Sequence, residues 1–205
     1  MTQAASAIRD SRLVAILRLR DHGLAVEVCD ALVRGGIRVL ELTQDDPGAL
    51  AALRAVAGRA DVVVGAGTVL DPASVPALAD AGARFVVAPN TDRRVIAAAL
   101  AAGLDPMPGA LTATEVACAL EAGATLVKLF PAGPLGPGYL RVLRGPFEGV
   151  ELVPTGGIAH DAVGAWLAAG AAAVGLGSDL VAARPTDADL ATIEARARVA
   201  VEAAR

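Results

Sequence analysis

Short apolar runs alternate with longer amphipathic stretches along almost the whole chain, and the runs indicate β-strands. Most of them are continuously apolar rather than alternating, which is typical of parallel strands covered on both faces. The run at 104–109 fits least well, because its two prolines cannot donate backbone hydrogen bonds. The eight predicted strands are residues 13–18, 38–43, 61–67, 84–89, 104–109, 125–131, 150–156 and 172–178.

The stretches between these runs are rich in Ala and Leu and have the composition of helices. Five of them have clear bounds, at residues 23–36, 71–82, 92–103, 112–123 and 160–170. Each ends at a glycine that is expected to adopt the left-handed conformation after a helix; these are Gly36, Gly82, Gly103, Gly123 and Gly170. Asp71, Thr112 and Asp161 are the expected N-caps.

This alternation predicts eight βα units between Leu13 and Arg205, after a short N-terminal helix. No linker or charge block divides them, so we expect one domain over residues 1–205. Eight consecutive units favour a closed (β/α)8 TIM barrel, an α/β fold, over an open doubly wound sheet. In such a barrel the chemistry lies at the C-terminal ends of the strands.

Composition narrows the class of protein further. Hydrophobic residues make up 55% of the 205 positions, and the net charge of −4 without any Lys/Arg cluster argues against a nucleic-acid partner. Cys29 and Cys118 form neither a disulfide framework nor a metal-ligand spacing, so no metal cofactor is expected. Residues 1–11 lack a signal-peptide pattern, and the apolar runs are too short to span a membrane. We therefore expect a soluble cytoplasmic protein.

Lys128 lies inside the apolar run 125–131. A lysine is rarely buried in a strand unless it is paired or functional. Burial disfavours the ammonium form and so favours a neutral amine, the form that attacks a carbonyl carbon to make a Schiff base. The alternative is a structural lysine that extends to solvent at a barrel end or pairs with an internal carboxylate.

Glu41 is a carboxylate within the strand 38–43, on the same face as Val39 and Thr43. If Val39 points into the barrel, Glu41 does too, nearer its C-terminal mouth. A carboxylate there could act as a general acid and base. A purely structural Lys128–Glu41 ion pair would have the same sequence signature, since proximity favours the charged form of both groups.

Further polar residues follow predicted strands. Arg18 ends the first strand, and its planar guanidinium suits a carboxylate or a phosphate, although a solvated Arg would fit the pattern equally well. Thr68, in Gly-Ala-Gly-Thr, is a candidate donor to a carboxylate. His22 and His160 lie at predicted helix starts, where capping or simple exposure is the expected role.

Two glycine-rich segments follow the seventh and eighth strands, at 154–158 and 175–180. Barrels frequently bind phosphate there through backbone N–H groups. Glycine permits close approach of the backbone to a ligand, and a serine adds a hydroxyl. The residues concerned are Gly156, Gly157, Gly177 and Ser178.

The segments ILR, GGIRVLELT, VGAGTVL, FVVAPN, PGALTATE, VKLFPAGPLGPGYLRVLRGPF, PTGGI and AVGLGSDLV, taken together, resemble the 2-dehydro-3-deoxy-phosphogluconate (KDPG) / 4-hydroxy-2-oxoglutarate (KHG) aldolase family. The resemblance extends from about Leu13 to Ala182. Its most specific parts are the Lys-Leu-Phe-Pro strand and the Gly-Ala-Gly-Thr and Thr-Gly-Gly elements.

The resemblance implies a homotrimeric (β/α)8 enzyme, a class I aldolase that uses a lysine Schiff base and no metal. Such an enzyme cleaves a phosphorylated 2-keto-3-deoxy sugar acid to pyruvate and glyceraldehyde 3-phosphate, in carbohydrate metabolism of the Entner–Doudoroff type, and can also act on 4-hydroxy-2-oxoglutarate. By motif, Lys128 matches the Schiff-base lysine and Glu41 the catalytic acid and base. The matching substrate contacts are Thr68 for the pyruvate carboxylate, Pro89 in the pocket lining, and Gly157, Gly177 and Ser178 for the phosphate, beside Thr155 and Gly156.

The resemblance leaves the preferred substrate open. Some members carry Arg four residues after the catalytic Glu, where this chain has Asp45; others, including galactonate-type aldolases, use the Arg that ends the first strand, which Arg18 matches. The AILR, APN and GLGSDL segments resemble the 2-dehydro-3-deoxy-6-phosphogalactonate branch, whereas Thr155 resembles the gluconate branch. The competing hypotheses are another phosphate-binding barrel enzyme, such as an epimerase or synthase, and a non-catalytic barrel scaffold, which Asp45 favours.

Overall fold

The computed structural model describes residues 3–205, which form nine strands. They are β1 (Leu13–Leu17), β2 (Val39–Thr43), β3 (Val63–Gly67), β4 (Phe85–Val87), β5 (Asp105–Met107), β6 (Gly109–Ala110), β7 (Leu126–Leu129), β8 (Glu151–Pro154) and β9 (Val174–Leu176). All pairings are parallel, in a six-stranded sheet of order β5-β4-β3-β2-β1-β9 and a three-stranded sheet of order β6-β7-β8. The predicted parallel α/β fold is confirmed.

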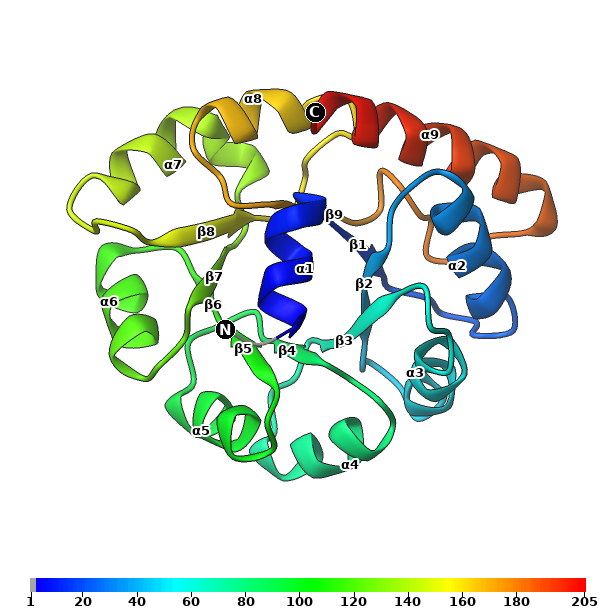
Figure 1. Ribbon diagram of the computed structural model, residues 1–205, viewed down its shortest axis with the longest axis horizontal. Coiled ribbons are helices and arrows are strands. Elements are labelled where there is room, and N and C mark those ends of the chain that lie inside the picture. Colours follow the sequence, from blue (N-terminus) through cyan, green and yellow to red (C-terminus); the bar gives the residue numbers. More distant parts are fainter. Residues whose placement is uncertain (1–2) are drawn as a thin grey trace.

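The helices lie outside the curled strands, as Figure 1 shows, except for α1 (Gln3–Ser11), which lies across the centre of the ring that the strands form. The others are α2 (Ala25–Arg34), α3 (Ala49–Ala57), α4 (Val75–Asp80), α5 (Arg93–Ala101), α6 (Ala113–Glu121), α7 (Gly136–Arg144), α8 (Val163–Ala168) and α9 (Leu190–Ala203). Short 3₁₀ turns are η1 (Pro72–Ser74), η2 (Gly133–Leu135) and η3 (Asp187–Asp189). The predicted N-terminal helix is thus present as α1.

The predicted strand at 104–109 is divided into two. Pro108 separates β5, which pairs with β4, from β6, which pairs with β7. A proline has no N–H to donate to a ladder, so a change of partner strand at this position leaves no donor unsatisfied. One isolated parallel bridge, between Thr155 and Gly175, links the ends of the two sheets on the side of β8 and β9.

The predicted helix ends are confirmed, and two of the three predicted N-caps are. All five terminal glycines have positive φ, from 73° at Gly103 to 100° at Gly36. Asp71 caps η1, and Thr112 forms a capping box with Glu115 at the start of α6. The N-cap predicted at Asp161 is wrong: α8 has Ala162 at that position, without a side-chain cap. The N–H of Ala162 donates to Ala159 in a turn that delays the helix by one residue.

Two apolar clusters form the core. The larger one fills the space between the strands and the outer helices. The smaller one lies inside the curve of the strands and contains buried residues from both sheets and from α1: Val14, Val39, Phe85, Val87, Met107, Leu126, Val153 and Ala173 meet Ala4, Ala5 and Ile8. The inward-facing polar residues therefore sit above an apolar floor, near the carboxyl ends of the strands.

Candidate active site

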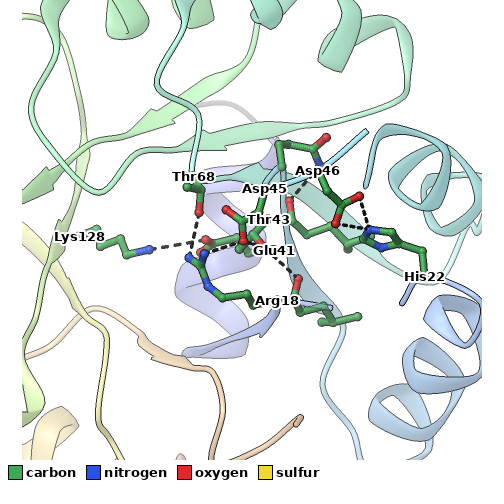
Figure 2. Close-up of polar contacts among 11 residues, drawn as sticks. Arg18, His22, Glu41, Thr43, Asp45, Asp46, Thr68 and Lys128 are labelled. Carbon is green, nitrogen blue, oxygen red and sulfur yellow. Dashed lines mark hydrogen bonds and ion pairs between the residues drawn. The ribbon is translucent and has the colours of Figure 1, made fainter. Parts of the chain in front are cut away.

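Lys128 and Glu41 face each other inside the curve of the sheets (Figure 2). Lys128 is on β7 and Glu41 on β2, and Nζ lies 3.5 Å from Oε1. Both residues are buried, with 6% and 1% of their surface exposed. The Phe130 ring lies beneath the amine, with its centroid 5.3 Å from Nζ. The predicted meeting of an inward lysine with an inward carboxylate is therefore what the structure shows.

Lys128 is also the only lysine in the sequence, a signal that inspection of the strand pattern alone overlooks. The other 17 of the 18 basic residues are arginines. Arginine serves every purpose of a permanent positive charge, but it cannot lose its proton in a protein and so cannot act as a nucleophile. A chain that uses arginine everywhere else and keeps one buried lysine points to a need for an amine at that position.

Gly67 makes room for the Glu41 carboxylate. It is the last residue of β3, in register with Thr43 of β2, two residues beyond Glu41. A Cβ at position 67 would lie 2.2 Å from Oε1 and 2.6 Å from Cγ of Glu41. Any larger residue would therefore push the carboxylate out of its present place. The Gly-Ala-Gly-Thr segment pointed only to Thr68, so sequence reasoning missed this glycine.

Arg18 lies at the mouth, beyond β1, and is held by two partners (Figure 2). Its Nη1 is 2.5 Å from Oδ2 of Asp45, and its Nη2 donates to Oγ1 of Thr68 at 3.0 Å. The Thr43 hydroxyl donates to the same Asp45 oxygen at 2.9 Å. Since Thr43 and Glu41 share one face of β2, these contacts connect the exposed guanidinium to the strand that carries the buried carboxylate.

A cavity of about 320 Å³ opens between the carboxyl ends of β1, β7, β8 and β9. Seven of the predicted site residues line it: Arg18, Lys128, Thr155, Gly156, Gly157, Gly177 and Ser178. A larger cavity of about 580 Å³ lies at the amino ends of the strands beside α1 and is lined by Arg38, Arg59 and Arg84 among others. We take the smaller cavity as the candidate active site because it contains the buried amine.

The remaining predicted residues, all within the described part of the chain, lie outside that lining. Glu41 forms an ion pair with Lys128, and Thr68 accepts a hydrogen bond from Arg18. Pro89 follows β4, and its carbonyl oxygen would lie 2.3 Å from a Cβ at Gly109. Pro89 therefore packs against the start of β6, and it does not join the group that lines the cavity.

The glycine-rich ends of β8 and β9 form one wall of the cavity. Gly156 and Gly157 both have positive φ, 90° and 73°, which suits glycine. The N–H of Gly133 donates to the carbonyl of Gly156 at 2.8 Å and holds that loop against η2. Next to Ser178, the Asp179 carboxylate accepts hydrogen bonds from His160. Burial alone would raise the pKa of Asp179, but these bonds, with the charges of His160 and Arg196, hold it below its usual value.

Residues 3–205 contain no group of three or more His, Cys, Asp and Glu side chains placed to hold a metal ion. The same residues include no helix with the length and apolar character needed to cross a bilayer.

The curled parallel strands hold a buried lysine–carboxylate pair near their carboxyl ends, an arrangement typical of an α/β enzyme. Comparisons with known proteins support this class. The family model for KDPG and KHG aldolase matches residues 4–196. The 2-dehydro-3-deoxy-6-phosphogalactonate aldolase of Escherichia coli (strain K12) is 36% identical over 171 residues, 82% of this chain and 83% of its own.

Two solved structures are similar over nearly their whole length. The 2-keto-3-deoxy-6-phosphogluconate aldolase of Zymomonas mobilis ZM4 with 3-phosphoglycerate has a TM-score of 0.88 at 32% identity, over 97% of this chain and 95% of that one. KDPG aldolase from Legionella pneumophila, with pyruvate captured at low pH as a covalent carbinolamine intermediate, has a TM-score of 0.82 at 29% identity, over 99% and 97%.

The chain belongs to the KDPG and KHG aldolase family. It is a class I aldolase, a carbon–carbon lyase. This family membership favours the aldolase hypothesis over an epimerase, a synthase or a non-catalytic scaffold.

Proposed function

We propose that the protein cleaves a 2-keto-3-deoxy-6-phospho sugar acid, of gluconate or galactonate type, to pyruvate and glyceraldehyde 3-phosphate through a Schiff base on Lys128. The observation that carries this proposal is the single lysine of the chain, buried with its Nζ 3.5 Å from Glu41 Oε1. 4-Hydroxy-2-oxoglutarate is a further candidate substrate because it contains the same 4-hydroxy-2-keto acid unit. Such a reaction belongs to Entner–Doudoroff-type sugar-acid breakdown.

The reaction begins when the neutral Lys128 amine attacks the C2 carbonyl to give a carbinolamine, which loses water to form an iminium ion. Glu41 then removes the C4 hydroxyl proton, the C3–C4 bond breaks, and its electron pair moves into the iminium to give an enamine. Glyceraldehyde 3-phosphate leaves. Glu41 returns its proton to C3, and water hydrolyses the resulting iminium to release pyruvate and free Lys128.

Substrate binding is assigned to the two ends of the cavity. Arg18 and Thr68, which already contact each other, are the proposed ligands of the keto acid carboxylate. The phosphate lies at the opposite glycine-rich wall, bound by Gly157, Gly177 and Ser178, with Thr155 and Gly156 nearby. Fixing the two charged ends of one substrate places its C2 at the amine and its C4 hydroxyl near Glu41.

We also propose that the two sheets are parts of one closed (β/α)8 barrel in a single domain. The Thr155–Gly175 bridge, the continuation of β5 into β6 through Pro108, and an interior cluster shared by both sheets support closure. From the family we further propose a cytoplasmic homotrimer without a metal cofactor. Light scattering of the purified protein, and activity after treatment with a chelator, would test these two points.

The decisive experiment is borohydride reduction in the presence of pyruvate. A pyruvate-derived mass should appear on intact protein, and peptide mapping should place it at Lys128. Because the chain has one lysine, the N-terminal amine is the only other amine that mapping must exclude. Lys128→Met, whose side chain has similar length and is apolar, should fold, form no adduct and show no turnover. A folded wild-type protein without the adduct would overturn the proposal.

A further inference from the structure

One carboxylate oxygen connects the two glycine-rich loops of the cavity. Oδ2 of Asp179, in the loop after β9, accepts a hydrogen bond from the backbone N–H of His160 at 2.7 Å and lies 2.6 Å from Nδ1 of the same residue. His160 belongs to the loop after β8. The pair is partly buried, with 23% of the His160 side chain and 38% of the Asp179 side chain exposed.

Both partners stand close in sequence to residues of the proposed phosphate site. Asp179 directly follows Ser178 and itself lines the cavity, and His160 comes three residues after Gly157. Arg196 of α9 donates from Nη1 to the backbone carbonyl of Asp179 at 2.7 Å, so the β9 loop is also held from outside. The His160–Asp179 contact therefore joins the loop after β8 to a loop that α9 also holds.

The hydrogen bonds between His160 and Asp179 also reduce the repulsion between the Asp179 carboxylate and a bound phosphate. An ionised carboxylate in the wall of a site for a phosphate dianion repels the ligand unless its charge is engaged elsewhere. The His160 backbone N–H and ring nitrogen both bond to Asp179, and charge-assisted hydrogen bonds of this kind are among the strong ones in proteins. The carboxylate can then contribute rigidity to the loops with less cost to anion binding.

We propose that the His160–Asp179 pair positions the two glycine-rich loops at the spacing that a phosphate requires, and so determines the preference of the enzyme for phosphorylated over unphosphorylated substrates. The inference rests on the proposed aldolase function and deepens it. His160 and Asp179 are positioning residues, since the backbone and hydroxyl groups of Gly157, Gly177 and Ser178 contact the phosphate itself.

The test compares two aldehydes that differ only in the phosphate. With pyruvate in the synthesis direction, kcat/KM is measured for D-glyceraldehyde 3-phosphate and for D-glyceraldehyde, and their ratio reports phosphate preference. His160→Ala should lower the ratio about 10-fold, chiefly through KM for the phosphorylated aldehyde, the order expected for loss of one charge-assisted hydrogen bond. The value for D-glyceraldehyde should change much less.

Two further variants separate positioning from general damage. His160→Asn keeps an N–H donor at nearly the place of Nδ1 and should restore most of the ratio. His22→Ala is the matched control, because His22 makes a similar pair with Asp46 at 2.9 Å, outside the cavity lining. It should leave the ratio unchanged.

The outcomes are distinguishable from failure of the proposed function. Absence of the borohydride adduct in the wild-type protein refutes the aldolase mechanism, and this inference with it. A wild-type protein that forms the adduct but has no phosphate preference overturns this inference alone. So does a His160→Ala variant that forms the adduct and keeps the wild-type ratio, or one that loses activity equally on both aldehydes, or failure of His160→Asn to restore the ratio.

Discussion

Nη1 of Arg18 lies 2.5 Å from Oδ2 of Asp45, so the guanidinium that we assign to the substrate carboxylate already holds a carboxylate of the protein. Both groups are partly exposed, with 55% of the Arg18 and 30% of the Asp45 side chain accessible. The Thr68 hydroxyl accepts a hydrogen bond from Nη2, the other terminal nitrogen of the guanidinium. A keto acid that binds to Arg18 must therefore bind beside the Asp45 carboxylate or displace it.

Asp45→Asn should strengthen the binding of the keto acid. The substitution keeps a hydrogen-bond acceptor near Arg18 but removes the negative charge that competes with the substrate. Exposed ion pairs contribute at most about 1 kcal/mol, so KM for pyruvate should fall by about 3-fold, with kcat nearly unchanged. Steady-state kinetics in the synthesis direction measure this, with Asp46→Asn as the neighbouring control. A rise in KM would instead show that Asp45 is needed to orient Arg18.

Glu41→Gln should separate Schiff-base formation from bond cleavage. The amide cannot take the C4 hydroxyl proton, so kcat for cleavage should fall by about 100-fold or more, within the range for general acid–base catalysis. The substitution leaves the Lys128 amine in place to attack the pyruvate carbonyl. The pyruvate adduct should therefore still form on borohydride reduction. Simultaneous loss of adduct and turnover in a folded variant would argue against this division of roles.

Gly67→Ala tests whether the place of Glu41 depends on the missing side chain. The added methyl would lie 2.2 Å from Glu41 Oε1 and must displace the carboxylate. We expect a fall in kcat of at least about 10-fold with the fold retained. Gly138→Ala is the matched control: it lies in α7, and a Cβ there meets nothing within 4 Å. That variant should keep full activity and gain up to about 1 kcal/mol in stability.

Much of the fold could be predicted because each local signal had one structural solution. Continuous apolar runs require cover on both faces, and the five glycines that end helices need the left-handed conformation that they adopt. The two prolines already mark the run 104–109 as a poor strand, but its division at Pro108 depends on which neighbouring strands the chain finds on either side. The late start of α8 depends on one turn hydrogen bond, from Ala162 to Ala159.

The candidate site was predictable where a residue contradicted its surroundings. Lys128 and Glu41 stand out in apolar strands, and their alternation places both inward. The partners of partly exposed groups were not predictable, because Asp45 and Asp179 have ordinary positions in polar loops and become significant only through distances to Arg18 and His160. Gly67 was missed for a similar reason: it matters because it has no Cβ, which leaves space for the Glu41 carboxylate.

The capping box of α6 gives a prediction about stability and pH. Glu115 accepts hydrogen bonds from the N–H groups of Leu111 and Thr112 at 2.9 and 2.8 Å, and these bonds lower its pKa below the usual value for a glutamate. A lowered folded-state pKa stabilises the protein above the unfolded value, and the gain is lost as pH falls through the folded value. Glu115→Gln should therefore lower the free energy of unfolding by about 1 kcal/mol near neutral pH, and this difference should shrink as the pH falls through the lowered pKa of Glu115. Urea denaturation across pH measures both quantities. Glu121→Gln is the control, because it removes only an exposed partner of Arg93, and it should change stability by less than about 0.5 kcal/mol. A Glu115→Gln effect that does not vary with pH would contradict the assignment to the charged carboxylate.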